Sequence, residues 1–256
     1  MPSRRRCCDL LVGLILTLAL VALSACQVLK AAPAPDSGFL QHATELKEMR
    51  ERAPFNAIWT ADSEAFSEMK ERYKKLVILP VRTEFVEEKI KSADLPPSLE
   101  MQRLEEAQEM ANYMVERFKA AIVDYPNKPI EVVDTPGPDT FVLELALVEV
   151  VPTDAVLNVI GTAAGFLVRG TGVVRYAATG SIAIEGILRD GATNQSLLEF
   201  KDREIDKNSA FSLKDFQEYA HIRQSIDDWA SQYAELSATP LDHTVDDSAP
   251  FTLNPF

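Results

Sequence analysis

The stretch TFVLELALVEVVP, residues Thr140–Pro152, carries the clearest structural pattern in the chain and decides the fold. Every second residue in its first half is large and apolar: Phe141, Leu143, Leu145 and Leu147. Successive side chains of a β-strand point to opposite faces, so a period of two places these residues on one face. The turn sequence PGPD stands directly before the stretch. The sequence therefore predicts a long strand that turns one apolar face toward a core.

Further strands are predicted on both sides of this stretch. The segment SIAIEGILRDGATNQSLLEFKDREI, residues Ser181–Ile205, has two alternating halves and predicts a β-hairpin with its turn around Asp190–Asn194. The short apolar runs KKLVILPV, ending at Val81, and PIEVVD, around Val133, predict two more strands. About five strands are expected in all.

Two apolar stripes with a spacing of three or four residues predict long amphipathic helices. The first lies between Ser98 and Asp124, behind Pro96-Pro97, and comprises Leu104, Ala107, Ala111, Met114, Phe118 and Ile122. The second comprises Phe216, Tyr219, Ile222, Ile226, Trp229 and Tyr233. The sequence therefore predicts a single α+β (mixed α/β) domain, in which two long helices cover a mostly antiparallel sheet of about five strands.

Both ends of the chain lack such periodicity. The stretch QVLKAAPAPD alternates alanine and proline, which favours an extended spacer, so residues 26–36 are expected to form a tether that begins with Cys26. The last stretch, SATPLDHTVDDSAPFTLNPF, predicts a flexible tail over residues 237–256. A globular domain is then expected over residues 37–236.

Residues 1–25 have the layout of a secretory signal peptide. Arg4, Arg5 and Arg6 precede the apolar run LLVGLILTLALVALSA, which extends from Leu10 to Ala25. This run is shorter than the about 20 apolar residues that a membrane-spanning helix needs. The alternative is a signal helix that stays in the membrane as an anchor.

The end of the run, LSAC at residues 23–26, resembles the lipobox of bacterial lipoproteins. The resemblance implies cleavage between Ala25 and Cys26, a diacylglycerol on the Cys26 thiol, and an acyl chain such as palmitate on the new amino group. Gln27 stands where lipoproteins retained in the inner membrane typically have Asp. The implied destination is the outer membrane, with the domain on its periplasmic face or, as the alternative, on the cell surface. Two or more acyl chains on Cys26 would anchor the protein firmly.

Cysteine usage and net charge exclude several classes of function. Cys7 and Cys8 lie in the leader, so the mature chain keeps no thiol for a disulfide, a metal or catalysis. Without the leader the chain carries 23 basic and 38 acidic residues, a net charge of −15. Nucleic-acid binding depends on Lys and Arg that neutralise phosphates, so no nucleic-acid partner is expected. The acyl chains, and not electrostatic attraction to anionic lipid, are the expected contact with the membrane.

Five of the ten glycines fall in GTAAGFLVRGTGVVRYAATG, residues 161–180. The segment has neither the Gly-Lys-Ser/Thr of a phosphate-binding loop nor the third glycine of G-x-G-x-x-G, so no nucleotide cofactor is predicted. The uncharged stretch VLNVIGTAAGFLV, residues 156–168, is too short to span a bilayer as a helix. It predicts either a tightly packed connection between strands or a partner surface, whose candidate residues are Val156, Gly161, Gly165, Phe166 and Leu167.

No motif for catalysis or metal binding is found. The three histidines, His42, His221 and His243, share no i, i+4 spacing, and no G-x-S-x-G nucleophile elbow exists. Paired acids are typical of a solvated surface in a chain this acidic. Trp229 and Trp59 are predicted to pack within the fold and not to stack on sugars. The sequence therefore predicts no catalytic, cofactor-binding or metal-binding residue.

Four segments follow one another along the chain: SGFL at Ser37–Leu40, the strand after PGPD, the hairpin, and a terminal helix with DDWA at Asp227–Ala230. In this order they resemble a family of bacterial lipoproteins known only as a domain of unknown function. The family tends to have Asp-Ala-Ala-Thr-Gly in the hairpin turn, where this chain ends the turn with Asn194, a residue that tolerates the left-handed conformation. The resemblance implies no reaction and no catalytic residues.

Three functions are then open. We expect a non-catalytic interaction or assembly module of the cell envelope, whose partner is an envelope protein. The first alternative is a periplasmic binding module for a small ligand, a lipid or a cell-wall fragment, with a cleft beside the glycine-rich segment. The second alternative is a carboxylate-based hydrolase, which buried and closely spaced acids with raised pKa values would favour.

Overall fold

The computed structural model describes residues 31–49, 53–61, 63–126, 130–152, 180–205, 219–240 and 243–248. The chain divides into two compact units, residues 1–31 and 32–256, and the fold given below is that of the second unit. Among the residues so described, none of the helices combines the length and the apolar character that a membrane crossing requires.

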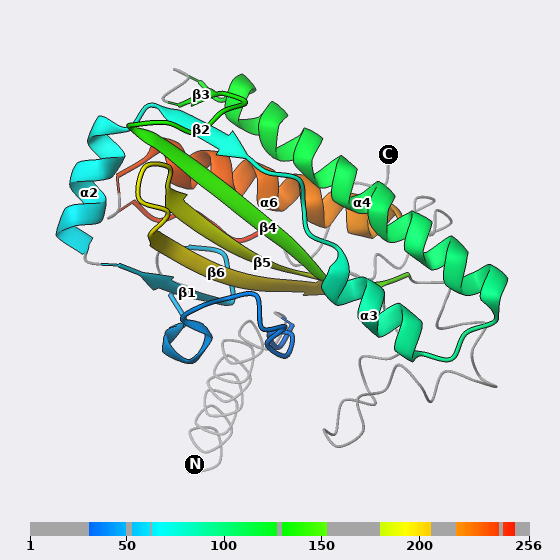
Figure 1. Cartoon of the computed structure of the whole chain (residues 1–256). Helices are drawn as coiled ribbons and strands as arrows, with labels where there is room; N and C mark the ends of the chain where they lie inside the picture. The colour runs from blue at the N-terminus through cyan, green and yellow to red at the C-terminus, as the bar shows by residue number, and fades with distance from the viewer. Residues whose placement is uncertain are drawn as a thin grey trace, which may run out of the picture. The chain divides into compact units, whose positions relative to one another are not determined.

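A six-stranded sheet runs through the described part of the domain in the order β1-β6-β5-β4-β2-β3 (Figure 1). Its strands are β1 (Ala57–Thr60), β2 (Lys75–Ile78), β3 (Glu131–Val132), β4 (Thr140–Val151), β5 (Ser181–Asp190) and β6 (Ser196–Ile205). Strands β4, β5, β6 and β1 pair antiparallel, whereas β2 pairs parallel with both β4 and β3. The predicted mixed fold with a mostly antiparallel sheet is confirmed, and β1 is the strand beyond the five expected.

Strand β4 is the strand predicted from TFVLELALVEVVP, and its alternating apolar residues face the core as expected. Leu143, Leu145 and Leu147 are fully buried, together with Ile182 and Ile184 of the neighbouring β5. Burial of apolar area contributes about 25 cal/mol per Å², so this continuous face is a main source of the stability of the domain.

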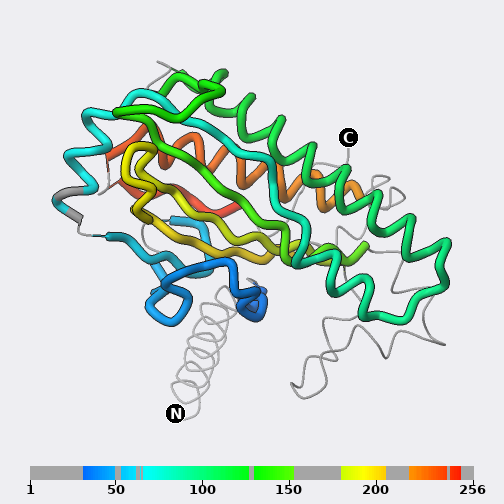
Figure 2. The backbone as a smooth tube through the Cα atoms, in the orientation of Figure 1, coloured from blue at the N-terminus to red at the C-terminus, as the bar shows by residue number. Residues whose placement is uncertain are grey.

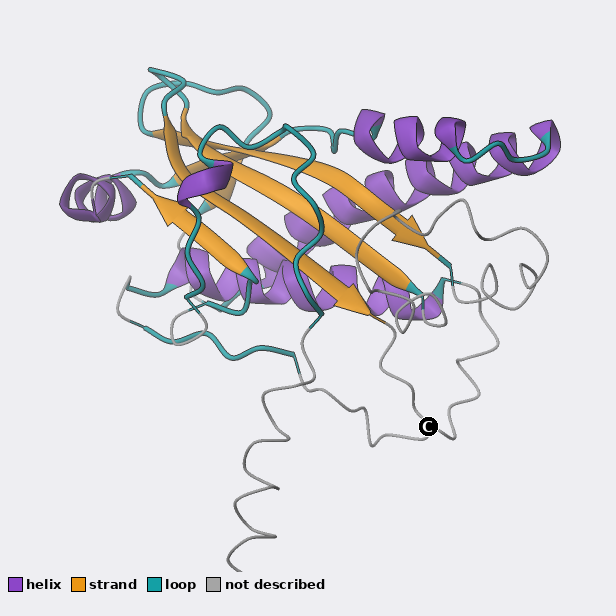
Figure 3. Cartoon of the chain, turned by 90° about the horizontal axis from the view of Figure 1, so that it is seen from below, coloured by secondary structure: helices purple, strands orange, loops and turns teal. Residues whose placement is uncertain are grey.

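Two long helices cover that face of the sheet, and Figure 3 shows them behind the strands. They are α4 (Pro97–Asp124) and α6 (Ala220–Ala238), which also pack against each other. The predicted stripe of α4 is buried from Ala107 to Ile122, and Trp229 of α6 is buried as expected. The indole N–H of Trp229 donates to the Asp202 carboxylate on β6 at 2.7 Å, which satisfies the ring's polar atom inside the core.

Three smaller elements complete the described domain: the 3-10 helix η1 (Ala43–Glu45) and the helices α2 (Ser63–Arg72) and α3 (Glu84–Ser92). Helix α3 packs beside β4 and buries Val86 and Ile90. Its Lys89 donates to the Val148 carbonyl at 2.7 Å, where the register between β4 and β5 shifts. This bond attaches α3 to β4 at the irregular pairing.

The hairpin turn between β5 and β6 adopts the conformation that its residues predict. Asn194 has a φ of 61°, the left-handed conformation that asparagine tolerates, and its N–H donates to the Asp190 carbonyl. The Asp190 carboxylate accepts the Ala192 N–H at 2.8 Å. Gly191 donates to the Thr140 carbonyl, and a Cβ at this position would lie 2.7 Å from that oxygen. The turn is therefore fixed against the start of β4.

The middle of β5 has no side chain at Gly186, and the ring of Phe200 on β6 occupies the space. Gly186 and Phe200 face each other across the two strands. Phe200 is fully buried and stacks on Phe55, with 4.3 Å between the ring centroids. A Cβ on residue 186 would lie 2.2 Å from Cζ of Phe200, so the ring and a side chain cannot both fit.

We expect Gly186→Ala to lower the free energy of unfolding by about 3 kcal/mol, because the core would be overpacked around a ring that Phe55 holds in place. The measurement is urea denaturation followed by circular dichroism. Gly137→Ala is the matched control, since its Cβ would meet only Thr140 Oγ1 at 3.9 Å. Equal stability of the two variants would contradict the packing described for Phe200.

Candidate functional site

The second face of the sheet is covered by residues 34–46, which we call the strap. Figure 2 shows this N-terminal segment beside the hairpin, and Figure 3 shows it in front of the strands. Its apolar residues Ala34, Phe39 and Leu40 pack on a small cluster formed by Ala146, Val148, Ala183 and Ile187. Ala34 lies within the predicted tether, so this packing begins before residue 37, the expected start of the domain.

Glu185 of β5 is the first of two carboxylates buried under the strap. Its side chain points to the strap side of the sheet, and the residue is 1% exposed. Ser37 binds both carboxylate oxygens: the backbone N–H donates at 3.2 Å and the hydroxyl at 2.5 Å. Burial raises the pKa of Glu185 above its ordinary value, although the hydrogen bonds from Ser37 and the charge of Lys201 oppose this shift.

Glu199 of β6 is the second buried carboxylate, and it is 0% exposed. The backbone N–H of His42 donates to one oxygen at 2.8 Å, and His42 Nδ1 lies 2.8 Å from the other, which also accepts the Ser196 hydroxyl at 2.8 Å. Burial raises the pKa of Glu199, but the hydrogen bonds from His42 and Ser196 outweigh burial and leave the pKa below its ordinary value.

The His42 ring is held on its other side by Trp59 of β1. The two rings stack with 3.6 Å between their centroids and 4° between their planes. Trp59 therefore packs within the fold, as predicted, and His42 occupies one face of its indole. His42 of the strap thus contacts β1 through Trp59 and β6 through Glu199.

Further charges on this face are also paired. The guanidinium of Arg189 lies 2.9 Å from Glu144, that of Arg203 lies 2.7 Å from Glu149, and Lys201 lies 2.5 Å from Asp36 of the strap. Ion pairs that are partly shielded from water need good geometry to offset their desolvation. The pairs connect β4, β5 and β6 to each other and to the strap.

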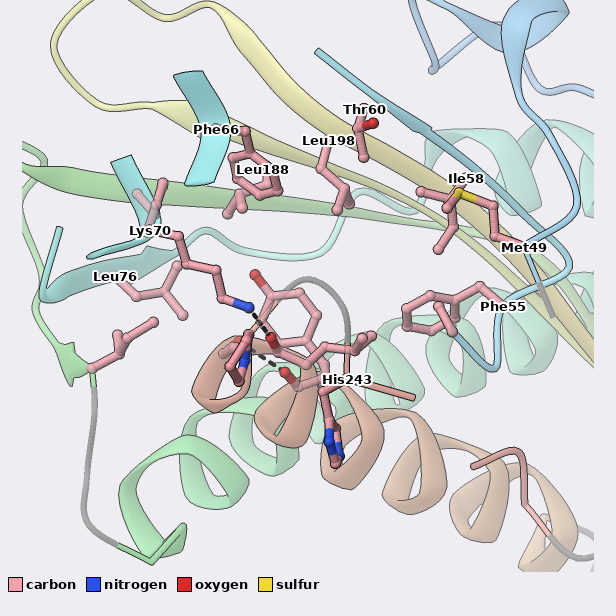
Figure 4. Close-up of a pocket in the computed structure, with 17 residues that line it drawn as sticks. Met49, Phe55, Ile58, Thr60, Phe66, Lys70, Leu76, Leu188, Leu198 and His243 are labelled. Atoms are coloured by element: carbon pink, nitrogen blue, oxygen red, sulfur yellow. Dashed lines mark hydrogen bonds between the residues drawn. The ribbon is translucent and has the colours of Figure 1, made fainter. Parts of the chain in front are cut away.

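A cavity lies on the opposite, helix-covered side of the sheet, between α2, the C-terminal end of α6 and the strands (Figure 4). Its volume for the centres of water-sized molecules is about 130 Å³. The walls are mostly apolar and include Phe55, Ile58, Phe66, Phe141, Leu188 and Leu198. Polar groups come from Thr60, Lys70, Tyr233, Ser237 and His243. Such apolar walls with few polar groups are typical of small-molecule sites.

Lys70 of α2 brings a cation to this cavity. Its Nζ donates to the Leu236 carbonyl at 2.6 Å and also to the Thr239 carbonyl, both at the C-terminal end of α6. Carbonyls at that end have no intrahelical partner, and the helix dipole favours a positive charge there. Burial lowers the pKa of Lys70 to about 8, because the ammonium is partly removed from water.

Most residues that the sequence predicts to be functional lie outside the described part of the chain. These are the lipidation and cleavage residues Ala25 and Cys26, and the partner-surface residues Val156, Gly161, Gly165, Phe166 and Leu167. The glycine-rich segment around which a ligand cleft was expected also lies there. The cavity reported above is lined by residues 49–76, 130–141, 188–198 and 233–243.

The three histidines do not come together in the described structure. His42 binds Glu199, His243 binds Glu235 on α6 at 3.0 Å and lines the cavity, and His221 lies on the first turn of α6. Within the residues described, no group of three or more His, Cys, Asp or Glu side chains is placed to hold a metal ion.

The sequence does not predict the cavity or the role of the two buried glutamates. Glu185 interrupts the otherwise apolar segment SIAIEGIL, which is a usable signal, because a charge inside a buried strand requires partners. Lys70 gives no such signal, since it stands in the charged helix segment SEMKER.

These features define an α+β domain whose sheet is covered by helices on one face and by its own N-terminal strap on the other. The chain belongs to the family described as Protein of unknown function (DUF3313), whose model matches residues 35–233. The family match therefore begins within the strap and ends within α6. The family predicted from the motifs is confirmed.

Comparison with solved structures finds distant likenesses. A PelC dodecamer from Paraburkholderia phytofirmans has 8% sequence identity and a TM-score of 0.32, over 63% of this chain and 89% of that one. The lipoprotein GNA1162 from Neisseria meningitidis has 11% identity and a TM-score of 0.20, over 59% of this chain and 93% of that one. No curated protein matches the sequence.

The two glutamates should respond to pH in opposite directions. At about pH 7 we expect Glu199→Gln to cost about 1–3 kcal/mol of unfolding free energy, because its three charge-assisted hydrogen bonds are weakened. The Glu199 pKa is lowered in the fold, so its stabilisation is present above the ordinary value of 4.5 and is lost as the pH falls through the folded pKa. The difference between wild type and Glu199→Gln should therefore narrow in acid.

For Glu185→Gln the sign is reversed. The folded pKa of Glu185 is raised above 4.5. The unfolding free energy of the wild type, relative to that of the variant, is therefore lowest at neutral pH and rises as the pH falls. Urea denaturation of both variants at about pH 7 and about pH 4 measures these differences. If acid changed the unfolding free energy of the wild type relative to each variant in the same direction, the opposite environments of the two carboxylates would be contradicted.

Proposed function

We propose that this chain is a bacterial envelope lipoprotein, anchored by acyl chains on Cys26 in the outer membrane, whose periplasmic domain is a non-catalytic interaction module. The observation that carries the proposal is the strap. The segment that follows the lipobox is built into the domain through Ser37 and His42, which bind two carboxylates of the central sheet. Acyl chains on Cys26 would therefore attach the sheet to the membrane through the strap.

The covalent distance between anchor and domain supports a position close to the membrane. Seven residues lie between Cys26 and Ala34, the first strap residue of the cluster on the strap side of the sheet, so eight residue-to-residue steps separate the two. A fully extended chain spans at most about 3.6 Å per residue, so this connection reaches at most about 29 Å. A partner that this domain contacts would then lie in the membrane or in the layer next to it.

The described buried acids support a structural role and not catalysis. Glu185 and Glu199 lie on adjacent strands, diagonal to each other in the register, and their pKa values are shifted in opposite directions. Such a pair would fit an acid and a base of a hydrolase. Both, however, are covered by the strap and already bind Ser37 and His42. The binding-module alternative is favoured by the apolar cavity at Lys70.

Anchoring is tested by Cys26→Ser. We expect this variant to lose lipidation, because the acceptor thiol is absent, and to disappear from the outer-membrane fraction, because the acidic domain has no attraction of its own to anionic lipid. The matched control is Cys8→Ser in the leader, which should remain with outer membranes. Density-gradient fractionation with detection by immunoblot gives the result. Sedimentation of Cys26→Ser with outer membranes at wild-type level would refute the anchor.

The partner surface is tested by photocross-linking in intact cells. A photoreactive amino acid at Phe166 should give one discrete protein adduct, because an uncharged apolar segment of this kind is typical of an interface. The control position is Met101 on α4, which is 60% exposed and lies outside the proposed surface. The same adducts at both positions, or none at Phe166, would count against residues 156–167 as the interface.

A further inference from the structure

The cavity between α2, α6 and the sheet has the properties of a site for an anionic chain molecule. Its apolar walls come from residues of β1, β2, β4, β5 and β6 and from both helices. A volume of about 130 Å³ is far above the roughly 10–15 Å³ that one water-sized group needs, so the cavity can take a run of several such groups. An aliphatic chain of medium length is such a run.

The polar residues of the cavity are few: Thr60, Lys70, Tyr233, Ser237 and His243. Figure 4 shows the Lys70 amine between the apolar side chains and the end of α6. A cell-wall sugar or peptide carries many hydroxyl and amide groups, each of which needs a partner when buried. The cavity offers too few partners for such a ligand, whereas a hydrocarbon chain needs none.

The ammonium of Lys70 supplies the charge that would recognise the head of the ligand. An ammonium has three donors, and two of them bind the carbonyls of Leu236 and Thr239. In the described part of the chain, no carboxylate lies within 4 Å of Lys70 Nζ, and burial lowers its pKa. A partly buried cation bound only to neutral oxygens is complementary to an anion.

We propose that this cavity binds a medium-chain fatty carboxylate, with the hydrocarbon chain between the strands and the helices and the carboxylate on Lys70. The chain would contact Phe66, Phe141, Leu188 and Leu198, and the third Lys70 donor would bind the carboxylate. The apolar contacts supply the affinity, and the charge pair selects an acid over an alcohol or an amine.

The experiment uses residues 27–256 without lipid, since the whole helix-side core and the strap cluster lie in the unit formed by residues 32–256. Isothermal titration calorimetry with sodium decanoate, below its micelle concentration, should show saturable binding. Decan-1-ol and decyltrimethylammonium have the same chain without the negative charge, and we expect them to bind at least tenfold more weakly. Equal binding of all three would overturn the role of Lys70, and no saturable decanoate binding would overturn the site.

Variants separate the charge from the cavity. Lys70→Met keeps a long side chain but removes the ammonium, and we expect at least a tenfold loss of decanoate affinity. Lys75→Met, an exposed lysine on β2, is the matched control and should bind like wild type. Leu198→Trp should abolish binding by filling the cavity.

A structural explanation of the Lys70→Met result is excluded by two measurements. Thermal unfolding reports whether the variant is folded, and Lys70→Arg, which restores a cation, should recover most of the affinity. Wild-type affinity in Lys70→Met or in Leu198→Trp would place decanoate elsewhere and refute the proposal. The outcome is independent of the proposed anchor, because Cys26 is absent from the protein used.

Discussion

The structure depends on one constraint: strand β5 is buried at all ten of its positions. Antiparallel sheets commonly leave one face in water, but a strand buried on both faces needs cover on both. The helices α4 and α6 cover one face, and the strap covers the other. Every charge on the strap side then needs a partner, because an unpaired buried charge costs several kcal/mol. Ser37 and His42 of the strap meet this need for Glu185 and Glu199.

The helix-covered half of the domain follows from the sequence, because its signals are local. The period of two in β4 and the apolar stripes of α4 and α6 each predict which residues face the core. The turn at Asn194 follows from its residue types alone. Strand β1 is the element beyond the expected five, since four residues are too few to show a period, and β1 is held through its register with β6.

The strap-covered half does not follow from the sequence, because its cover comes from far away in the chain. The apolar residues around Glu185 signal a buried charge that needs a partner, but they do not say which one, since Ser37 is 148 residues earlier. The Ala/Pro composition of residues 31–35 favours an extended chain, and an extended chain can still lie packed on a sheet. The cavity is equally non-local, since its walls converge from seven elements and only the tertiary fold brings them together.

Stability alone does not account for Lys70. An ammonium partly removed from water costs free energy, and a methionine of similar length would pack the same apolar walls without that cost. The carbonyls at the end of α6 are commonly satisfied by water or by a capping residue, so they do not require a lysine from another helix. Residues that work against the stability of their surroundings, as Lys70 does, concentrate at functional sites.

Strand β6 contributes to both faces of the sheet. Leu198 lines the cavity, and the next residue, Glu199, binds the strap. Successive side chains of a strand point to opposite faces, so β6 presents the proposed ligand site on one face and the strap contacts on the other.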